Sequence, residues 1–564
     1  RHSRGANRST LLFGNSGRRV EKGSRLSNED QEEVLVYAHH GSLAREFRLA
    51  VEQKLKKGEL QGIVATNSLE LGIDIGARDE VLLIQTPLSV AGTVQRLGRA
   101  GHQVGQVSKG TIFPTHGMDF LYAAVMTRAV YEGDIESVEP VCGALDVLTQ
   151  VILSLCVTQT WDMDELFSFL KTSHPFHELP RAQFDLVIQM LEGRYADTRV
   201  RELKPRIMVD RLDNTVRAKD SAAFLLYMAG GTIPDRGYYD LRLQDSKAKI
   251  GELDEEFVWE RSIGDTFALG NQVWHIQRIT HNHVEVSPGG QQLNIIPFWK
   301  ADAQDAAYHF SAKLAQFLEW ANEQLDQDHF KPTLMRDYHM TPSAAAELSA
   351  YLLRQREAGS QELPHRHHLL IEEFRDPAQH QDATQLILYT FWGGRVNRPF
   401  ALALSAAWQE TYQHPLQVFV NNDAVLLMLP SECQLQPLME LLTPDNVESY
   451  LIKKLEQTGY FGARFRENAG RALLLPKQNF KKRMPLWLNR LRSKKLLQTI
   501  QGFEDFPILL ETWRGCLRDE FDLPSLKARL EEIRTHEIHV TAVKTKKPSP
   551  FADGLVWRQT NQYM

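Results

Sequence analysis

Two polar segments of the chain hold residue types that suit the binding of a phosphate group. One is Gln95-Arg96-Leu97-Gly98-Arg99-Ala100-Gly101-His102, which places two arginines three residues apart beside glycines that permit close backbone approach. The other is Ala65-Thr66-Asn67-Ser68-Leu69-Glu70-Leu71-Gly72-Ile73-Asp74. Arginine has forked donors that pair with phosphate oxygens, and it stabilises the charge of a transferring phosphoryl group. Taken alone, the arginine-rich segment is better explained as a surface loop, whereas the pair predicts a phosphate-handling site.

Each segment follows an apolar run that predicts a β-strand. Gly62–Val64 leads into Ala65, and Val81–Ile84 precedes Gln95. Further strands are predicted at Thr10–Phe13, Val34–Tyr37 and Gly110–Phe113. An amphipathic helix is predicted at Ala44–Lys57. Because the carboxyl ends of parallel strands face the ligand crevice, we expect the polar segments to meet at one sheet edge. The predicted architecture is a parallel sheet with crossover helices.

A third polar cluster follows the first predicted strand. It consists of Asn15, Ser16, Arg18 and Arg19. Such side chains at a strand end can fix the backbone of a nucleic acid through its phosphates without reading bases. A solvated helix start explains the arginines equally well, and both interpretations remain open. His39 and His40 have no carboxylate or cysteine at ligand spacing, which favours a structural role.

In order along the chain, residues 11–16, 65–74 and 95–102 resemble motifs IV, V and VI of the second RecA-like lobe of superfamily 2 helicases. The resemblance is strongest to the Lhr (large helicase-related) family and extends over nearly the whole chain. It implies an ATP-dependent enzyme whose nucleotide lies between two RecA-like lobes.

The resemblance also implies roles for individual residues of motif VI. Arg99 matches the arginine that reaches the γ-phosphate, and Gln95 matches the glutamine that couples the nucleotide to the lobe interface. Arg96 belongs to the same nucleotide-binding set, and we expect it to tie the motif to neighbouring carboxylates. His102 stands where many superfamily 2 helicases have an arginine. The catalytic residues implied are therefore Arg99 and Gln95.

Motif V is expected to serve both the nucleotide and the nucleic acid. Gly72 and Asp74 match the end of the motif that approaches the ribose, although a helix cap or strand-end carboxylate also explains Asp74. Thr66 and Asn67 match positions that contact the nucleic-acid backbone.

The segments that would hold ATP and Mg²⁺ from the other side are not found in this sequence. A Walker A loop requires Gly-Lys, and that dipeptide occurs nowhere in the 564 residues. None of the four Asp-Glu pairs continues as D-E-x-H. We therefore expect the first RecA-like lobe, with the Mg²⁺ ligands, to lie upstream of Arg1. The chain is then a fragment that is inactive by itself.

Composition limits the class of protein. With 564 residues, three or more domains are expected. A net charge of −6 argues against coating nucleic acid over the whole surface but allows a local basic channel. Neither a signal peptide nor a run of eighteen apolar residues is present, so we expect a cytoplasmic protein without a membrane partner. The four cysteines lack C-x-x-C spacing, which suggests neither a disulfide framework nor a metal site.

Residues 131–234 are predicted to form a winged helix, because helical spacing is followed by a short hairpin signal around Asp213-Asn214. The segment Gly230–Gly237 cannot continue a helix and resembles the family's joining loop. Ile233 could wedge against a base step or pack the domain junction, and Arg236 could hold a phosphate.

Residues 235–564 are predicted to be β-rich to about residue 300, as a small barrel, and then mixed α/β. Trp299 follows Pro297 and precedes Lys300, which suits base stacking, although a buried core tryptophan is equally compatible. The acid-free basic run 477–495 could clamp a phosphate backbone or form a solvated helix face.

The predicted fold class is therefore α/β multidomain, with a RecA-like lobe at 1–130, a winged helix at 131–234 and an Lhr-type C-terminal domain at 235–564. The predicted function is part of an ATP-dependent helicase that moves 3′ to 5′ on single-stranded DNA or an RNA:DNA duplex, in DNA repair. A non-catalytic winged-helix nucleic-acid-binding protein is the alternative.

Overall fold

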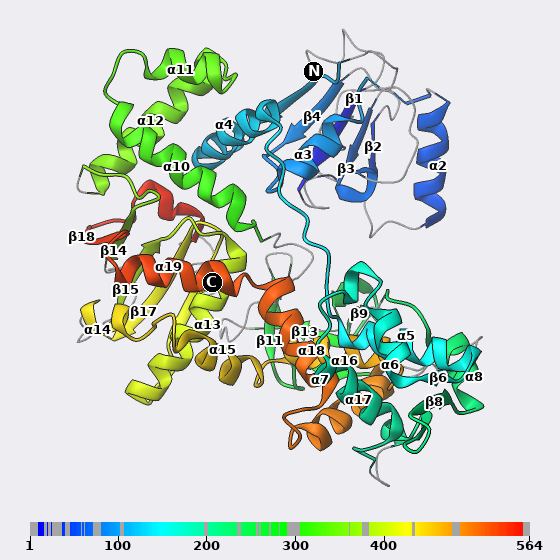
Figure 1. Cartoon of the computed structure of the whole chain (residues 1–564). Coiled ribbons are helices and arrows are strands. Elements are labelled where there is room, and N and C mark those ends of the chain that lie inside the picture. Colours follow the sequence, from blue (N-terminus) through cyan, green and yellow to red (C-terminus); the bar gives the residue numbers. More distant parts are fainter. Residues whose placement is uncertain are drawn as a thin grey trace.

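The computed structural model (Figure 1) describes most of the chain. The described residues are 10–15, 20, 24, 27, 36–39, 45–57, 59–60, 62–70, 80–101, 107–196, 201–233, 238–254, 258, 261–269, 272–280, 283–289, 305–359, 361–374, 383–430, 435–475 and 486–555.

The first part is a parallel five-stranded sheet in the order β2-β3-β1-β4-β5, as predicted. Its elements are β1 (Thr10–Gly14), β2 (Val36–His39), α2 (Arg45–Lys56), β3 (Gly62–Ala65), η2 (Asn67–Leu69), β4 (Glu80–Ile84), α3 (Val90–Leu97) and β5 (Gly110–Phe113). Leu11, Ile63 and Val81 on the central strands are fully buried. Continuous apolar strands of this kind belong to a parallel sheet that is covered on both faces.

Helix α4 (Gly117–Glu132) connects this sheet to the last part of the chain. It begins at the His116 cap and ends at Gly133, whose left-handed backbone (φ 68°) stops the helix. Met118, Leu121 and Val125 belong to the same core as α10 (Tyr308–Gln324) and α12 (Pro342–Ala358). In Figure 1, α4 lies between the sheet and these helices, so residues 185 and more positions apart share one core.

The middle part has the predicted helices and hairpin. Its elements are α5 (Leu145–Thr158), β6 (Trp161–Asp162), α6 (Met163–Leu170), η3 (His174–Phe176), α7 (Arg181–Glu192), η4 (Arg201–Leu203), β7 (Ile207–Asp210), β8 (Thr215–Ala218) and α8 (Ser221–Ala229). The strands form a small sheet in the order β6-β8-β7. Asp162 caps α6 by accepting from the amides of Asp164 and Glu165. Asn214 takes the left-handed turn position (φ 51°) between β7 and β8.

A second five-stranded sheet follows in the order β10-β9-β13-β12-β11. Its strands are β9 (Tyr238–Leu243), β10 (Lys249–Asp254), β11 (Thr266–Leu269), β12 (Gln272–Ile279) and β13 (His283–Pro288). Strand β10 was not predicted, because charged residues, which are common on edge strands, outnumber its apolar residues. In the structure its Leu253 is buried. Its Lys249 Nζ lies 2.8 Å from Asp240 Oδ1 on the neighbouring strand. Pairing between β10 and β11 is not seen among the described residues, so closure into a barrel stays a prediction.

The last part is built on a mixed sheet in the order β16-β17-β15-β14-β18. Its strands are β14 (His368–Phe374), β15 (Ala383–Tyr389), β16 (Gln417–Val420), β17 (Ala424–Pro430) and β18 (His539–Lys544). The helices are α10, α11 (Phe330–Asp337), α12, α13 (Gly394–Tyr412), α14 (Leu435–Glu440), α15 (Val447–Leu455), α16 (Gly459–Arg471), α17 (Leu486–Ile500), α18 (Pro507–Arg514), the π-helix η5 (Gly515–Glu520), α19 (Leu523–Arg534) and the short η6 (Pro550–Ala552).

This sheet separates two cores. Successive strand residues point to opposite faces. Leu370 and Ile387 therefore join the core with α4, α10 and α12, whereas Ile371 and Leu386 join the core with α13 and α15. Helices α16 and α18 also pack against α5, which ties the last part to the middle part.

Helix α13 contains a proline, Pro399, inside its first turns. Proline has no amide hydrogen, so at this position it leaves the carbonyl of Arg395, four residues before, without its helical donor. The amide of Asp522 donates to that carbonyl over 3.0 Å. A contact with the start of α19 therefore allows Pro399 to lie inside the helix.

Candidate functional site

The carboxyl ends of β1, β3 and β4 bring the predicted motif residues together at one edge of the parallel sheet. Asn15 follows β1, and its side-chain amide donates to the carbonyl of Thr86, just after β4, over 3.1 Å. Half-buried Thr66 and exposed Asn67 follow β3. Residues that are 71 positions apart are thus held in register, as expected for strand ends in a parallel sheet.

Arg96 is the structural centre of this edge. Its side chain is 4% exposed, and its Nε donates to Oε2 of Glu70 over 2.9 Å. Nη1 donates to Asn15 Oδ1 over 3.2 Å, and the guanidinium carbon lies 5.4 Å from the centre of the Phe13 ring. One arginine therefore joins the strand ends of all three motifs, which matches the expected contact with a neighbouring carboxylate. A direct contact of Arg96 with nucleotide stays a prediction.

Arg99 lies in the turn after α3 and is half-buried, so it is not enclosed in the protein interior. Its Nη2 donates to the main-chain carbonyl of Glu70 over 2.7 Å. Glu70 therefore holds Arg96 by its side chain and Arg99 by its backbone. Gln95 is exposed on the last turn of α3.

The first turn of α3 is fixed by a residue from beyond α4. Glu136 accepts from the amides of Val90 (2.6 Å) and Ala91 (2.9 Å), and Ser89 caps the amide of Gly92. A carboxylate at a helix N-terminus satisfies unpaired amides and complements the helix dipole. The position of α3, and with it the turn that carries Arg99, therefore depends on a residue between α4 and α5.

His39 has the structural role predicted for it. It is 1% exposed, and its ring contacts Ser68 Oγ (2.8 Å, from Nδ1) and Glu52 Oε1 (3.0 Å, from Nε2). These bonds link the end of β2 to the turn after β3 and to α2.

Several predicted site residues lie outside the described residues. They are Ser16, Arg18, Arg19, Gly72, Asp74, His102, Arg236 and Trp299. Their assigned contacts stay predictions.

Ile233 lies on the loop after α8 with 92% of its surface exposed. Two bonds from α5 hold that loop: Gln150 Nε2 donates to the carbonyl of Gly231 over 2.9 Å, and the amide of Gly231 donates to Gln150 Oε1 over 3.0 Å. The exposed side chain of Ile233 is therefore not packed at a domain junction formed by the described residues, and a wedge against a base step stays a prediction.

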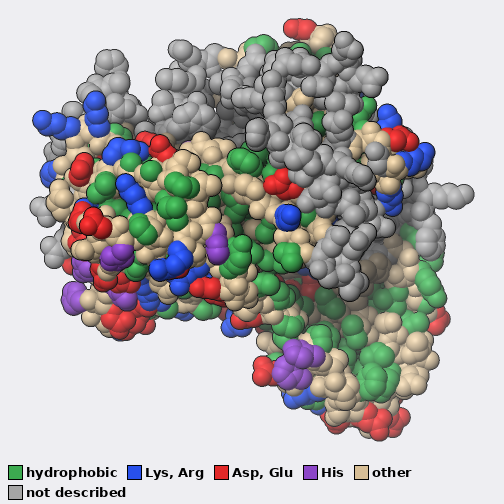
Figure 2. Space-filling view, turned by 90° about the horizontal axis from the view of Figure 1, so that it is seen from above, with side chains coloured by type: hydrophobic (Ala, Val, Ile, Leu, Met, Phe, Trp, Pro, Cys, Tyr) green, Lys and Arg blue, Asp and Glu red, His purple; other side chains and the backbone are tan. Residues whose placement is uncertain are grey.

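The described part of the basic run is engaged with the protein itself. Arg490 on α17 is 9% exposed and lies 4.7 Å from the centre of the Tyr239 ring. Arg492 Nε is 3.9 Å from Glu202 Oε1. On the face drawn in Figure 2, basic and acidic side chains are interspersed among the described residues. This part of the run thus connects the second sheet and the middle part to α17.

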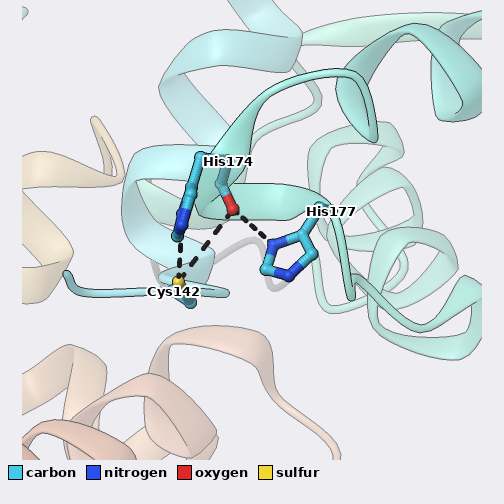
Figure 3. A group of neighbouring side chains, drawn as sticks. All are labelled: Cys142, His174 and His177. Carbon is cyan, nitrogen blue, oxygen red and sulfur yellow. Dashed lines mark hydrogen bonds between the residues drawn. The ribbon is translucent and has the colours of Figure 1, made fainter. Parts of the chain in front are cut away.

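One group of possible metal ligands is not signalled by the spacing of the cysteines along the chain. Cys142, His174 and His177 offer ligand atoms within 4.8 Å of one another. Figure 3 shows that these side chains come from two neighbouring segments of the chain. Cys142 Sγ lies 3.9 Å from His174 Nδ1. However, His177 Nδ1 lies 2.6 Å from the main-chain carbonyl of His174, so that nitrogen is a donor and not a free ligand. The ligand atom that His177 can offer is then Nε2.

The sequence also gave no reason to single out Glu70 and Glu136. A carboxylate partner was expected for Arg96, but nothing in the sequence distinguished Glu70 of motif V from other nearby carboxylates. Glu136 carries no local signal, because its partners lie 45 and 46 residues away.

Comparisons with known proteins agree with this organisation. The family described as "Helicase conserved C-terminal domain" matches residues 3–103, "Large helicase-related protein, winged helix domain" matches 128–296, and "DEAD/H associated" matches 363–552. The predicted α/β multidomain fold is confirmed. Among the helices of the described segments, none combines the length and hydropathy that a bilayer-spanning helix needs.

Individual relatives cover almost the whole chain. "Lhr helicase/ probable uracil glycosylase" of Mycolicibacterium smegmatis is 37% identical over 94% of this chain and 35% of its own length. "ATP-dependent helicase Lhr-Core" of Saccharolobus solfataricus is 28% identical over 97% of this chain and 64% of its own length. The chain thus spans about a third of the first relative.

Among solved structures, Mycobacterium smegmatis helicase Lhr bound to ssDNA and AMP-PNP superposes with a TM-score of 0.77. It is 33% identical, and the match covers 98% of this chain and 67% of that chain. Motif geometry, the three family matches and this superposition lead to one conclusion: the chain belongs to the Lhr helicase family.

Proposed function

We propose that this chain supplies the second RecA-like lobe, the winged helix and the C-terminal domain of an ATP-dependent helicase. The observation that carries the proposal is the position of Arg99. It is half-buried at the carboxyl edge of the parallel sheet, and Glu70 fixes it together with Arg96. An arginine held in this way at a lobe surface can stabilise charge on a phosphoryl group without rearranging.

ATP is the proposed nucleotide, since the solved relative contains AMP-PNP. Arg99 would contact the transferring phosphoryl group, Gln95 would couple it to the lobe interface, and Gly72 and Asp74 would approach the ribose. Mg²⁺ would neutralise phosphate charge, with its ligands on the first RecA-like lobe. The described Asp-Glu pairs do not offer a substitute, because Asp164, Asp519 and Glu520 are ion-paired with arginines.

Single-stranded DNA or an RNA:DNA duplex is the proposed nucleic-acid partner, with movement from 3′ to 5′. Asn67 is exposed beside the sheet edge that carries the motifs, and Ile233 is exposed on a loop that Gln150 holds. Both side chains can therefore contact a nucleic-acid strand. The solved relative is bound to ssDNA. A cytoplasmic location and a role in DNA repair complete the proposal; two relatives have names that pair helicase with uracil glycosylase.

The test is Arg99→Ala in the intact protein that carries both lobes. Strand-stimulated ATP hydrolysis should fall about 10³-fold or more, because an arginine finger contributes that much where it has been measured. Binding of a fluorescent single strand should change less than about twofold. Arg211→Ala is the matched control, since Arg211 is 77% exposed on the hairpin turn. Equal hydrolysis in both variants, or none in the wild type, would favour the non-catalytic binding protein.

A second test uses the 564-residue polypeptide alone. It should hydrolyse no ATP, because its sequence holds no Gly-Lys dipeptide for a phosphate loop. Strand-stimulated hydrolysis by this polypeptide would refute the division of the nucleotide site between two lobes.

A further inference from the structure

A chain of hydrogen bonds leads from the arginines at the edge of the parallel sheet to helix α4. Asn15 accepts from Arg96 Nη1 over 3.2 Å and donates to the carbonyl of Thr86 over 3.1 Å. The amide of Thr86 in turn donates to Asp119 Oδ1 over 3.0 Å. Thr86 thus binds Asn15 through its carbonyl and Asp119 through its amide. The segment after β4 therefore connects the motif residues to the first turn of α4.

Asp119 is buried, and it uses both of its carboxylate oxygens. Only 2% of its surface is exposed, and Oδ2 accepts from the amide of Thr115, shortly after β5, over 2.8 Å. The hydroxyl of Thr86 also donates to the main-chain carbonyl of Asp119 over 3.3 Å. A buried carboxylate that accepts from two amides is held in one position, because leaving it unpaired would cost free energy. One residue of α4 thus fixes the segments that follow β4 and β5.

Tyr122 carries the connection on to the last part of the chain. It lies three residues after Asp119, on the same face of α4, and its hydroxyl donates to Asp423 Oδ1. Both members of this bond are buried, and they lie 301 positions apart in the sequence. Burial and the Asp423 carboxylate raise the pKa of the Tyr122 hydroxyl well above its usual range. The hydroxyl therefore keeps its proton and remains the donor.

Asp423 lies in the turn between β16 and β17, and the sheet of the last part fixes its backbone. Its main-chain carbonyl accepts from the amides of Thr390 (3.0 Å) and Phe391 (2.9 Å), which follow β15. Its own amide donates to Asn421 Oδ1 over 2.9 Å. The hydrogen bonds that begin at Arg96 therefore end in this sheet. The residues between form a relay that consists of Asn15, Thr86, Asp119, Tyr122 and Asp423.

We propose that Asp119 and Tyr122 are positioning residues for ATP hydrolysis, which couple the arginines at the motif edge to the sheet of the last part. This inference rests on the proposed function. The relay acts through Arg96, whose partner Glu70 also holds Arg99. A guanidinium stabilises charge in the transition state only while it is held in place. Loosening the relay therefore lowers the rate of hydrolysis more than the affinity for ATP.

The first variant is Tyr122→Phe in the intact protein that carries both lobes, because it removes only the hydroxyl. We expect kcat for strand-stimulated ATP hydrolysis to fall about tenfold, the size of one hydrogen bond to a charged group. KM for ATP should stay within about twofold, and amide hydrogen exchange in peptides covering 85–101 should become faster.

Tyr338→Phe is the matched control. Tyr338 is 5% exposed, and its hydroxyl also joins α4 to the last part, by accepting from Arg128 Nη1 over 2.8 Å. It does not belong to the relay. The control should therefore change neither hydrolysis nor exchange at 85–101 by more than about twofold.

A double-mutant cycle separates coupling from a general loss of stability. Asn15→Ala and Tyr122→Phe change opposite ends of the relay, so either one already breaks it. The loss of hydrolysis in the double variant should be at least about threefold smaller than the product of the single losses. Asn15→Ala combined with Tyr338→Phe should give the full product. Asp423→Asn keeps an oxygen acceptor for the hydroxyl and should retain most of the wild-type rate.

Three outcomes would overturn the proposal. They are equal hydrolysis in Tyr122→Phe and Tyr338→Phe, equal exchange at 85–101 in these two variants, and independent effects of Asn15→Ala and Tyr122→Phe. Exchange needs no nucleotide, so it still decides on the relay if the wild type hydrolyses no ATP, a result that would refute the proposed function alone. Asp119→Asn can accept from only one of its two amides, and it replaces Tyr122→Phe, with the same expected pattern, if that variant does not fold.

Discussion

The side chain of Glu70 accepts from Arg96 while its main-chain carbonyl accepts from Arg99, so one residue after β3 holds an arginine in the last turn of α3 and another in the turn that follows. The two bonds differ in their sensitivity to mutation. Replacing the Glu70 side chain removes only the contact with Arg96.

Glu70→Gln is therefore expected to loosen α3 without removing the Arg99 contact. A neutral amide leaves the buried guanidinium of Arg96 without its charged partner, which costs about 1–3 kcal/mol. Amide hydrogen exchange in peptides covering 85–101 should become about tenfold faster, and ATP hydrolysis by the intact protein should fall. Glu59→Gln, at an exposed position of the same lobe, should change neither.

The cap provided by Glu136 gives a second prediction. In Glu136→Ala the amides of Val90 and Ala91 lose their acceptor, so exchange at 89–92 should rise and hydrolysis should fall several-fold. The affinity for single-stranded nucleic acid should stay within about twofold of the wild-type value, because the substitution does not alter Asn67 or Ile233. Glu139→Ala, on the same connecting segment, is the control. Unchanged exchange in Glu136→Ala would mean that Ser89 alone caps the helix.

Gln150→Ala is expected to release the loop that presents Ile233. Both bonds to Gly231 are lost, so hydrogen exchange at 230–233 should increase. Unwinding of a duplex with a 3′ tail should slow, while strand-stimulated ATP hydrolysis stays close to wild type. Gln150→Glu keeps the acceptor for the Gly231 amide and should give an intermediate effect. Normal unwinding by Gln150→Ala would show that the loop does not act on the duplex.

Cys156 should resist alkylation over the ordinary pH range. It is 3% exposed, and burial raises the pKa of its thiol to about 12, so almost no thiolate forms at pH 8. Iodoacetamide followed by mass spectrometry should modify half-buried Cys142 in the native protein and Cys156 only after denaturation. Labelling of native Cys156 at pH 8 would show that α5 opens in solution.

The lobe was predictable because its information is local. Five apolar runs, each followed by a turn, specify parallel strands, and the order of the polar segments after them specifies motifs IV, V and VI.

Other features were not predictable, because their partners are distant in the sequence. The start of α13 depended on the amide of Asp522, 127 residues after Arg395, and local propensity places proline at a helix start. Strand β10 was missed because charged residues are common at sheet edges. Glu136 and Gln150 have side chains that any helix or loop could carry.

The sequence by itself determined the family, the order in which motifs IV, V and VI follow their strands, and the absence of a Gly-Lys loop. These features depend only on residue types and on their spacing along the chain. The tertiary structure decided which side chains meet: Glu70 with both arginines, Glu136 with α3, and His539 with His368 across a parallel strand pair. The physical reason is that hydrogen bonds, ion pairs and metal ligands act over 2 to 4 Å in space, and only the packing of distant elements brings such groups together.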